Sequence, residues 1–208
     1  MRLCNQPTGR ASLGGSFSLL ALLAVLALSG CVTRQESAAS GTATEKPSAC
    51  AAFAEQRKTL RYQTEYRLSA PDTASADRNF KSLPNNESVR ARHYTLRFDR
   101  DRTGPCNHLT MHKELYLQRR DKSGYQFQEM REFFSGDGTL IAVKNETLAN
   151  QLLATGYYVA AVPLPIPATA PAGAYRVVTK LIATNGKGRP EILASASANF
   201  QVAANARQ

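Results

Sequence analysis

The residues best suited to chemistry are the histidines, and two of the three, His108 and His112, stand four residues apart. On a helix this spacing would place both rings on one face, as in zinc sites. The neighbouring residues alternate between polar and apolar, as in a strand, where four residues span about 13 Å at 3.3 Å per residue. One metal ion cannot join rings that far apart. We therefore predict no metal site and assign both histidines to the surface or to cross-strand contacts.

The sequence offers little else for catalysis. Outside the first thirty residues there is no serine nucleophile motif, no phosphate-binding loop and no EF-hand spacing. Glu129 and Glu132 are three residues apart, so on a strand their carboxylates face opposite sides. We therefore predict a protein that is not an enzyme and takes no cofactor. The alternative is an envelope hydrolase whose site is assembled from His93, His108 and Glu114.

The N-terminus has the three zones of a secretory signal peptide. Arg2 and Arg10 supply positive charge, an apolar run follows over Phe17–Leu28, and the small residues Ser29 and Gly30 close it. The apolar run is shorter than the roughly 20 residues that a membrane-spanning helix needs. This argues against a retained anchor helix, and we predict that the first thirty residues are removed on export.

The four residues Leu28-Ser29-Gly30-Cys31 resemble the lipobox of bacterial lipoproteins. The resemblance implies that the Cys31 thiol receives a diacylglycerol, that cleavage follows Gly30, and that the new amino group is acylated. Acyl chains anchor stably because each buried methylene contributes roughly 0.8 kcal/mol. Val32 stands where enteric-type lipoproteins of the inner membrane have Asp. The resemblance therefore favours the periplasmic face of the outer membrane.

Composition divides the rest of the chain. Residues 33–47 are rich in Ser, Ala, Thr and Glu and lack aromatic residues, so they cannot bury enough surface to offset chain entropy. We predict a lipidated cysteine and flexible tether over 31–47, one folded domain over 48–202, and a frayed tail over 203–208. The sequence makes no prediction about the oligomeric state.

The cysteines fit an exported protein. Cys4 leaves with the signal peptide and Cys31 carries the lipid, which leaves one pair, Cys50 and Cys106. The periplasm is oxidising, so we expect a disulfide between them, with two free thiols as the alternative. By the chain-entropy estimate, closing this loop would stabilise the fold by about 4 kcal/mol. Neither residue belongs to a Cys-x-x-Cys motif, so a redox enzyme is not indicated.

Charge is the unusual bulk property. The chain carries +10, and removal of Arg2 and Arg10 leaves +8, with most of the excess over residues 57–131. Arg61, Arg67 and Arg97 alternate with core-type residues, so strand geometry sends them to the solvent side. We predict that they form a basic face for an envelope protein or an anionic envelope polymer. The alternative is a basic surface that only keeps the domain soluble. Nucleic acid is not an expected partner in this compartment.

The folded part is dominated by residues of period two, which is typical of half-buried strands. A short helix is expected over Ala49–Lys58, and a long loop over Ala70–Glu87. A loop or helical turn is expected over Asn145–Ala154, with Leu148, Leu152 and Leu153 inward. The prolines at 163, 165 and 167 indicate an extended edge segment. We expect strands over residues 60–68, 93–99, 109–119, 125–133, 139–143, 157–163, 175–184 and 192–202.

The segment Pro171-Ala172-Gly173-Ala174-Tyr175-Arg176-Val177 resembles the Pro-x-Gly-x-Tyr turn and strand of extracytoplasmic immunoglobulin-like domains. The Cys-Trp-Cys core of antibody domains is missing. Together with the strand pattern, the resemblance implies an all-β fold, an antiparallel, Ig-like β-sandwich of about eight strands with a short N-terminal helix. We expect such a domain to act as a non-enzymatic binding or assembly module.

Overall fold

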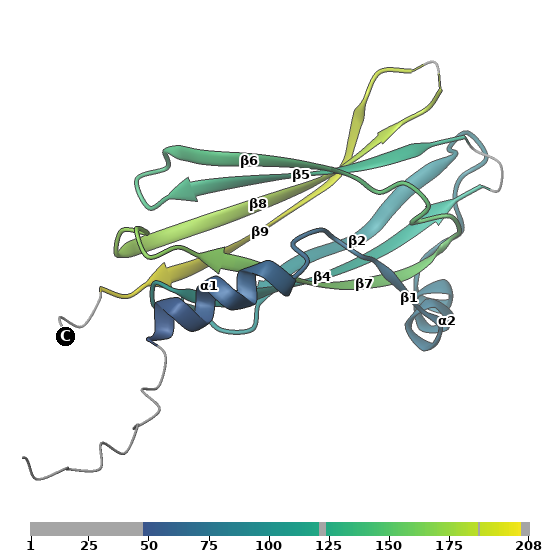
Figure 1. The fold of residues 1–208 in the computed structure, drawn as a ribbon. Helices are drawn as coiled ribbons and strands as arrows, with labels where there is room; N and C mark the ends of the chain where they lie inside the picture. The colour runs from purple at the N-terminus through teal and green to yellow at the C-terminus, as the bar shows by residue number, and fades with distance from the viewer. Residues whose placement is uncertain (1–47, 121–123, 187, 205–208) are drawn as a thin grey trace, which may run out of the picture. The chain divides into compact units, whose positions relative to one another are not determined.

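A computed structural model describes residues 48–120, 124–186 and 188–204 of the chain (Figure 1). The predicted signal peptide, Cys31 and the tether up to residue 47 lie outside the described residues. So does the end of the predicted tail, residues 205–208. Within the described part, no helix combines the length and the apolar character that a membrane crossing requires.

In the part of the chain that the structure describes, nine strands form two sheets that pack face to face, seen as two layers in Figure 1. Sheet A has the order β1 (Arg67–Ser69), β7 (Gly156–Ile166), β4 (Asn107–Arg119), β2 (Val89–Phe98). Sheet B has the order β3 (Arg102–Thr103), β9 (Glu191–Val202), β8 (Gly173–Thr184), β5 (Gln126–Ser135), β6 (Leu140–Thr147). The predicted β-sandwich is confirmed. It has nine strands rather than eight, and the short β3 pairs with β9 in parallel.

Alternating side chains build the core, as the period of two requires. On β4, Leu109, Met111, Leu115 and Leu117 all point inward and are fully buried. The inward residues of both sheets gather in two apolar clusters. One contains Leu115, Leu117, Phe127 and Leu181, and the other contains Leu109, Met111, Val162 and Val177.

Two helices lie on the outer face of sheet A, at different ends of it (Figure 1). The predicted N-terminal helix is confirmed as α1 (Ala49–Thr59). Its cap is Ser48, whose hydroxyl accepts a hydrogen bond from the amide of Ala51 at 3.3 Å. The predicted disulfide between Cys50 and Cys106 joins the first turn of α1 to the start of β4.

The predicted loop over Ala70–Glu87 is wrong in its first half, because α2 occupies Ala70–Asn79. Its ends carry ordinary helix signals: Pro71 in the first turn, Asp72 beside the helix N-terminus and Arg78 in the last turn. These signals were not recognised in the sequence, because the segment is rich in Ala, Ser and Asp and its apolar residues do not recur with a helical period. Tyr116 on sheet A anchors this helix by donating a hydrogen bond to Asp77 at 2.5 Å.

The predicted strand over residues 60–68 is also wrong in extent, because only Arg67–Ser69 joins a sheet. The preceding segment, Leu60–Tyr66, is extended and crosses between the edges of the two sheets; we call it the strap. Its side chains still alternate between the core and the surface, although its backbone pairs with no neighbouring strand among the described residues. Thr64 and Tyr66 point into the core with 2% and 9% of their surface exposed, whereas Arg61 and Glu65 are exposed.

Two further predictions differ in detail. In the loop after β6, Leu148 and Leu152 are buried as predicted, but Leu153 is 67% exposed. Leu152 adopts a positive φ of 55°, which turns the next side chain outward. The prolines of β7 lie beyond its three-residue pairing with β1, so they need no ladder partner on that side.

Candidate functional site

The outer face of sheet A is hollowed between its two helices. α1 covers the end of β4 near His108, and α2 covers the end near Tyr116. Between them, the outward side chains of β7 are the smaller Val159 and Ala161. A depression of about 330 Å³ therefore remains, which we call the hollow. Its lining residues are Arg61, Gln63, Glu65, Arg67, His112, Val159, Ala160 and Ala161.

The strap supplies the polar rim of the hollow. Because side chains alternate along the strap and into β1, the odd-numbered residues from Arg61 to Arg67 face outward together. The side chain of Arg61 is 80% exposed, and its guanidinium lies 3.2 Å from the carboxylate of Glu65. An exposed pair of this kind holds its partners weakly, so both side chains stay available to a ligand. The rim carries two arginines and one glutamate, which leaves it positive.

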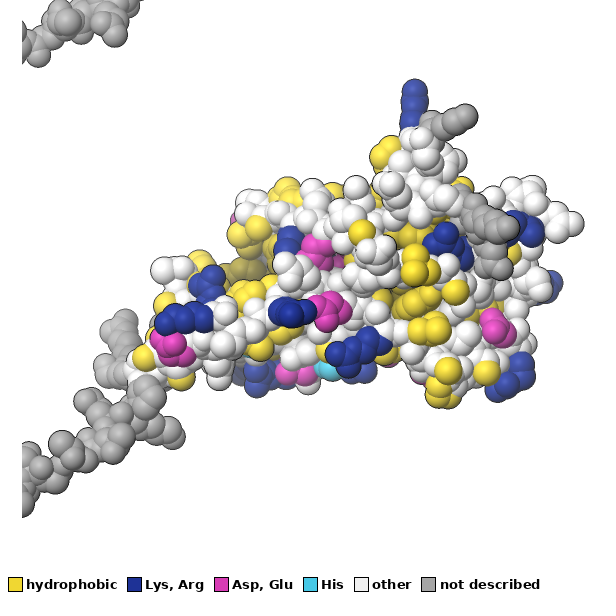
Figure 2. Space-filling model, turned by 45° about the vertical axis from the view of Figure 1, so that its right-hand side comes forward, with side chains coloured by type: hydrophobic (Ala, Val, Ile, Leu, Met, Phe, Trp, Pro, Cys, Tyr) yellow, Lys and Arg dark blue, Asp and Glu magenta, His cyan; other side chains and the backbone are white. Residues whose placement is uncertain are grey.

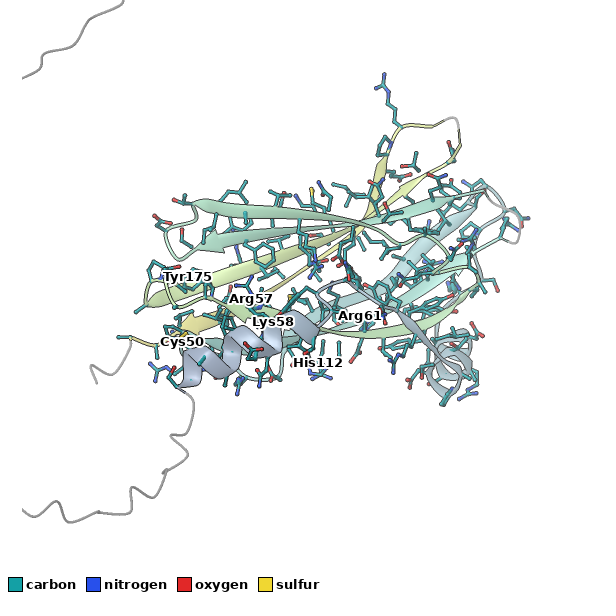
Figure 3. All side chains as sticks on the ribbon, viewed as in Figure 1. Cys50, Arg57, Lys58, Arg61, His112 and Tyr175 are labelled. Atoms are coloured by element: carbon teal, nitrogen blue, oxygen red, sulfur yellow. A yellow bond between two sulfur atoms is a disulfide. The ribbon has the colours of Figure 1, made fainter. Side chains whose placement is uncertain are left out.

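Arg97 lies on the same outer face. Its Cα is paired with that of His112 across β2 and β4, and its guanidinium is 63% exposed, 3.8 Å from Glu114. The three arginines singled out from the sequence thus share one face, two in the hollow and one beside it. The last turn of α1 brings Arg57 and Lys58 nearby, as Figure 3 shows for the labelled Arg57, Lys58, Arg61 and His112.

On the face that Figure 2 shows, the basic residues do not merge into one continuous field. Figure 2 shows Lys and Arg side chains interspersed with Asp and Glu and with apolar surface on the face in view. Recognition of an anion on this sandwich would therefore rest on local geometry at the hollow, rather than on bulk charge.

The structure assembles only part of the alternative hydrolase site. His93 lies 3.6 Å from Glu114, which also accepts a hydrogen bond from the Tyr157 hydroxyl at 2.6 Å. Burial and this bond raise the pKa of Tyr157, so the phenol stays neutral. His108 lies six residues from Glu114 along β4 and does not join them.

His108 is held beneath α1 instead. Its ring packs against Phe53 at 4.7 Å between centroids and shares a hydrogen bond of 3.0 Å with the Tyr62 hydroxyl. Burial and the charge of Arg57 lower its pKa. Its contacts are those of a packing residue. Among the described residues, no three His, Cys, Asp or Glu side chains form a group that could hold a metal ion.

Beneath the strap, four charged side chains lie inside the sandwich: Lys113, Glu129, Arg131 and Glu146. Their exposed fractions are 0%, 0%, 2% and 7%. We call them the polar layer, because they separate the two apolar clusters. Lys113 contacts Glu129 and Arg131 contacts Glu146, while Arg131 also lies 3.6 Å from Glu129. The two positive and two negative charges balance, as burial demands.

Neutral groups complete the polar layer. The hydroxyls of Tyr66 and Tyr94 donate to the same oxygen of Glu129, at 3.0 and 3.1 Å. Burial and the nearby carboxylate raise the pKa of both phenols, which therefore remain donors. Burial lowers the pKa of Lys113 to about 8, although its contact with Glu129 acts in the opposite direction.

The polar layer also holds the backbone of the strap. The amide of Thr64 donates to Glu146 at 3.0 Å, and the carbonyl of Tyr62 accepts from Arg131 at 3.1 Å and from Lys144 at 2.6 Å. Gln151 bonds both the Thr64 carbonyl and the Tyr66 amide, at 3.1 and 2.8 Å. Charged side chains thus take the place of a neighbouring strand.

Sequence reasoning missed the polar layer, although a signal was present. Lys113 stands between Met111 and Leu115, on the apolar parity of its strand. Glu129 and Arg131 likewise follow Phe127 on the apolar parity of β5. The prediction that Glu129 and Glu132 face opposite sides agrees with their burial, and the inward one belongs to the layer.

A second depression of about 750 Å³ opens near the turn between β5 and β6, and we call it the groove. Tyr175, labelled in Figure 3, marks this end of the sandwich. The lining is mostly apolar and includes Phe133, Ile141, Leu164, Ile166, Tyr175 and Val202. β6 is an edge strand of sheet B, and its Leu140, Ile141 and Val143 are about half exposed, at 50%, 54% and 47%.

No protein-family model matches the sequence, and no curated protein matches it. Several solved structures align with part of this chain. The CARDB domain of a Pyrococcus furiosus protein, in complex with di-metal ions, is 12% identical with a TM-score of 0.37, over 58% of this chain and 94% of that one. The C-terminal domain of wzt is 10% identical with a TM-score of 0.40, over 70% and 81%. A putative late embryogenesis abundant protein is 12% identical with a TM-score of 0.38, over 76% and 91%. Similarity at this level carries no argument about ligands or activity.

Proposed function

We propose that this chain is a lipid-anchored, non-enzymatic binding module of the bacterial cell envelope, and that the hollow on sheet A binds an anionic envelope component. One observation carries the proposal: Arg61 and Arg67 converge on a shaped hollow with His112, and Arg97 stands beside it. Arginine presents a fork of donors that matches carboxylate and phosphate groups. Its charge stays available because the neighbouring acids hold it only through exposed contacts.

The anchor rests on the lipobox and on the compartment that it implies. Replacement of the acceptor thiol in Cys31→Ser is expected to abolish palmitate labelling and to release the chain from the membrane fraction. A variant that still labels and sediments with membranes would refute lipid anchoring at this residue. Cys4 lies in the predicted signal peptide, so a Cys4→Ser control is expected to label normally.

Binding is tested with residues 31–208 carrying Cys31→Ser, so that the lipid cannot cause capture. We expect this chain to capture envelope material, and vesicles containing phosphatidylglycerol, at low salt and much less at high salt. Arg61→Glu, Arg67→Glu and Arg97→Glu together are expected to abolish that capture. The control reverses three exposed arginines elsewhere, Arg78, Arg102 and Arg189, with the same change in net charge. Equal losses in both triple variants would contradict a specific site.

The groove favours a second candidate, docking of a partner protein. An apolar depression beside an unpaired strand edge suits an extended segment that adds to the sheet and packs alternate side chains inward. In this case capture from the extract survives high salt, ignores the arginine variants, and is lost in Ile141→Lys with Val143→Lys. Salt-sensitive capture that ignores the β6 variants supports the hollow.

A further inference from the structure

We infer that Arg131 and Glu146, buried beneath the strap, are positioning residues for the hollow: they hold the strap where Arg61, together with Arg67 at the start of β1, can meet an anion. The inference rests on the proposed function for the identity of the ligand. It adds that binding at the surface depends on ionised groups that no ligand touches.

The strap is fixed differently from the segments on either side of it. Upstream, α1 is tied by the Cys50–Cys106 disulfide and by Phe53 against His108. Downstream, β1 is paired with β7. Among the described residues, the hydrogen bonds between the strap backbone and the sandwich go to side chains, of Arg131, Lys144, Glu146 and Gln151. Three of these four side chains are ionised, so the middle of the strap depends on charge.

The same backbone carries the binding residues. Thr64 and Tyr66 are held from inside, while Arg61 projects outside before them and Arg67, the first residue of β1, projects outside directly after them. Side chains of an extended chain alternate, with about 3.3 Å between neighbouring residues. A shift of the Thr64 backbone by that distance would therefore exchange the inner and outer sets. Inner hydrogen bonds thus fix the strap, and with it Arg61, in register as well as in place, whereas Arg67 is also fixed by the pairing of β1 with β7.

Glu146 is the most informative group to change, because it links both sides of this arrangement. One of its oxygens accepts from the amide and the hydroxyl of Thr64, at 3.0 and 2.8 Å. The other lies against Arg131 and 2.6 Å from Lys144, which themselves bond the Tyr62 carbonyl. Loss of its charge weakens the hydrogen bonds to the strap backbone at two positions, Tyr62 and Thr64.

The test compares Glu146→Gln with Glu132→Gln in residues 31–208 carrying Cys31→Ser. Glu132 is the matched control, because it lies on the outer face of sheet B and pairs with Lys180 at 2.9 Å, away from the strap. Hydrogen exchange of peptides from the strap and from β8 separates local loosening from unfolding. Vesicles containing phosphatidylglycerol serve as the anionic probe.

We expect Glu146→Gln to speed exchange of the strap about tenfold, the size expected for one lost charge-assisted hydrogen bond, while β8 exchanges as before. Vesicle binding is expected to weaken by a similar factor. Vesicle binding by the chain with Glu146 intact is expected to fall as the pH drops through the range in which carboxylates become protonated. The Glu146→Gln variant is expected to lose that dependence on pH. Glu132→Gln is expected to change none of these. Thr64→Val, which removes one hydroxyl at equal size, provides a milder second variant.

Unchanged exchange of the strap in Glu146→Gln and Thr64→Val would overturn the inference. So would faster exchange with undiminished vesicle binding, which would leave the proposed function standing. A wild-type chain that binds no vesicle and captures no envelope anion would instead refute the proposed function itself. The two failures are therefore distinguishable.

Discussion

The two faces of the strap handle charge in opposite ways. On the inner face, two cations and two anions are buried, balanced and hydrogen-bonded around Thr64. On the outer face, Arg61, Glu65 and Arg67 are exposed, and the positive charge is in excess. Buried charges must therefore balance one another, whereas exposed side chains can carry an excess of positive charge that a ligand can neutralise.

The comparison also explains why a sandwich of this size tolerates ions in its core. A strand inserted between two sheet edges would find backbone partners in a ladder. The strap has no ladder before Arg67, so its amides and carbonyls need other partners. The polar layer supplies them. Ionised groups that alone would cost stability here offset the cost of unpaired backbone groups.

The largest predicted effect is on the inner face. Arg131→Ala leaves Glu146 without its closest cation and the Tyr62 carbonyl without one donor. We expect the free energy of unfolding to fall by about 3–5 kcal/mol, as when one partner of a buried pair is removed. Urea denaturation of residues 31–208 carrying Cys31→Ser measures it. The exposed control, Arg97→Ala, is expected to stay within about 0.5 kcal/mol. Similar small losses of unfolding free energy in Arg131→Ala and Arg97→Ala would show that buried and exposed charges contribute equally to stability.

A comparable loss is expected upstream of the strap. Replacing both cysteines in Cys50→Ala with Cys106→Ala removes the crosslink that ties α1 to the start of β4. The chain-entropy estimate gives about 4 kcal/mol for a loop of this length. Urea denaturation under non-reducing conditions measures the loss. Two alkylatable thiols in wild-type periplasmic material, found by mass spectrometry, would show that the disulfide does not form.

A smaller effect concerns pH and again separates the faces. Burial alone would raise the pKa of Glu146, but the bond from Lys144, the charge of Arg131 and the bonds from Thr64 outweigh it and hold the pKa below that of an ordinary glutamate. The stability from this carboxylate is therefore complete above its unfolded pKa and is lost as pH falls through the lower, folded pKa. Between about pH 6 and pH 3, the free energy of unfolding is expected to fall less steeply with decreasing pH for Glu146→Gln than for wild type. Parallel curves would contradict the role of the charge.

The sequence predicted part of the difference between the two faces of the strap. The alternation around Thr64 correctly predicted that Thr64 and Tyr66 point inward, because side-chain period follows from extended backbone alone. Leu60 and Leu68 have the same parity but are 38% and 54% exposed, so the prediction fails at both ends of the segment. Its ladder was predicted wrongly, because pairing depends on where β6 and β7 end, which the strap sequence does not contain. The prediction for α2 failed for a related reason: packing against Tyr116, not an apolar period, stabilises that helix.

The polar layer was the least predictable feature. Lys113 and Glu129 stand 16 residues apart, on strands of different sheets, and each interrupts an otherwise apolar face. Either one alone suggests an irregular strand or an exposed position. Only the packing of the two sheets shows that the interruptions meet and neutralise each other. The convergence of Arg61 and Arg67 on one hollow depends in turn on the small outward side chains of β7.

The smallest effect on stability is expected on the outer face. Arg61→Glu with Arg67→Glu breaks only exposed contacts, so the free energy of unfolding is expected to change by less than about 1 kcal/mol. Binding of phosphatidylglycerol vesicles by the same variant is expected to be lost. Thermal or urea unfolding beside vesicle sedimentation measures both. A large loss of stability would mean that these arginines serve the fold rather than a ligand.

The most direct measurement is a double-mutant cycle between the two faces of the strap. Vesicle binding is compared for the wild-type strap, Glu146→Gln, the pair Arg61→Ala with Arg67→Ala, and all three changes together. If Glu146 acts through Arg61 and Arg67, Glu146→Gln weakens binding in the wild-type background and has no further effect once both arginines are gone. If its effect is the same in both backgrounds, the buried charge does not work through the strap, and the central claim is contradicted.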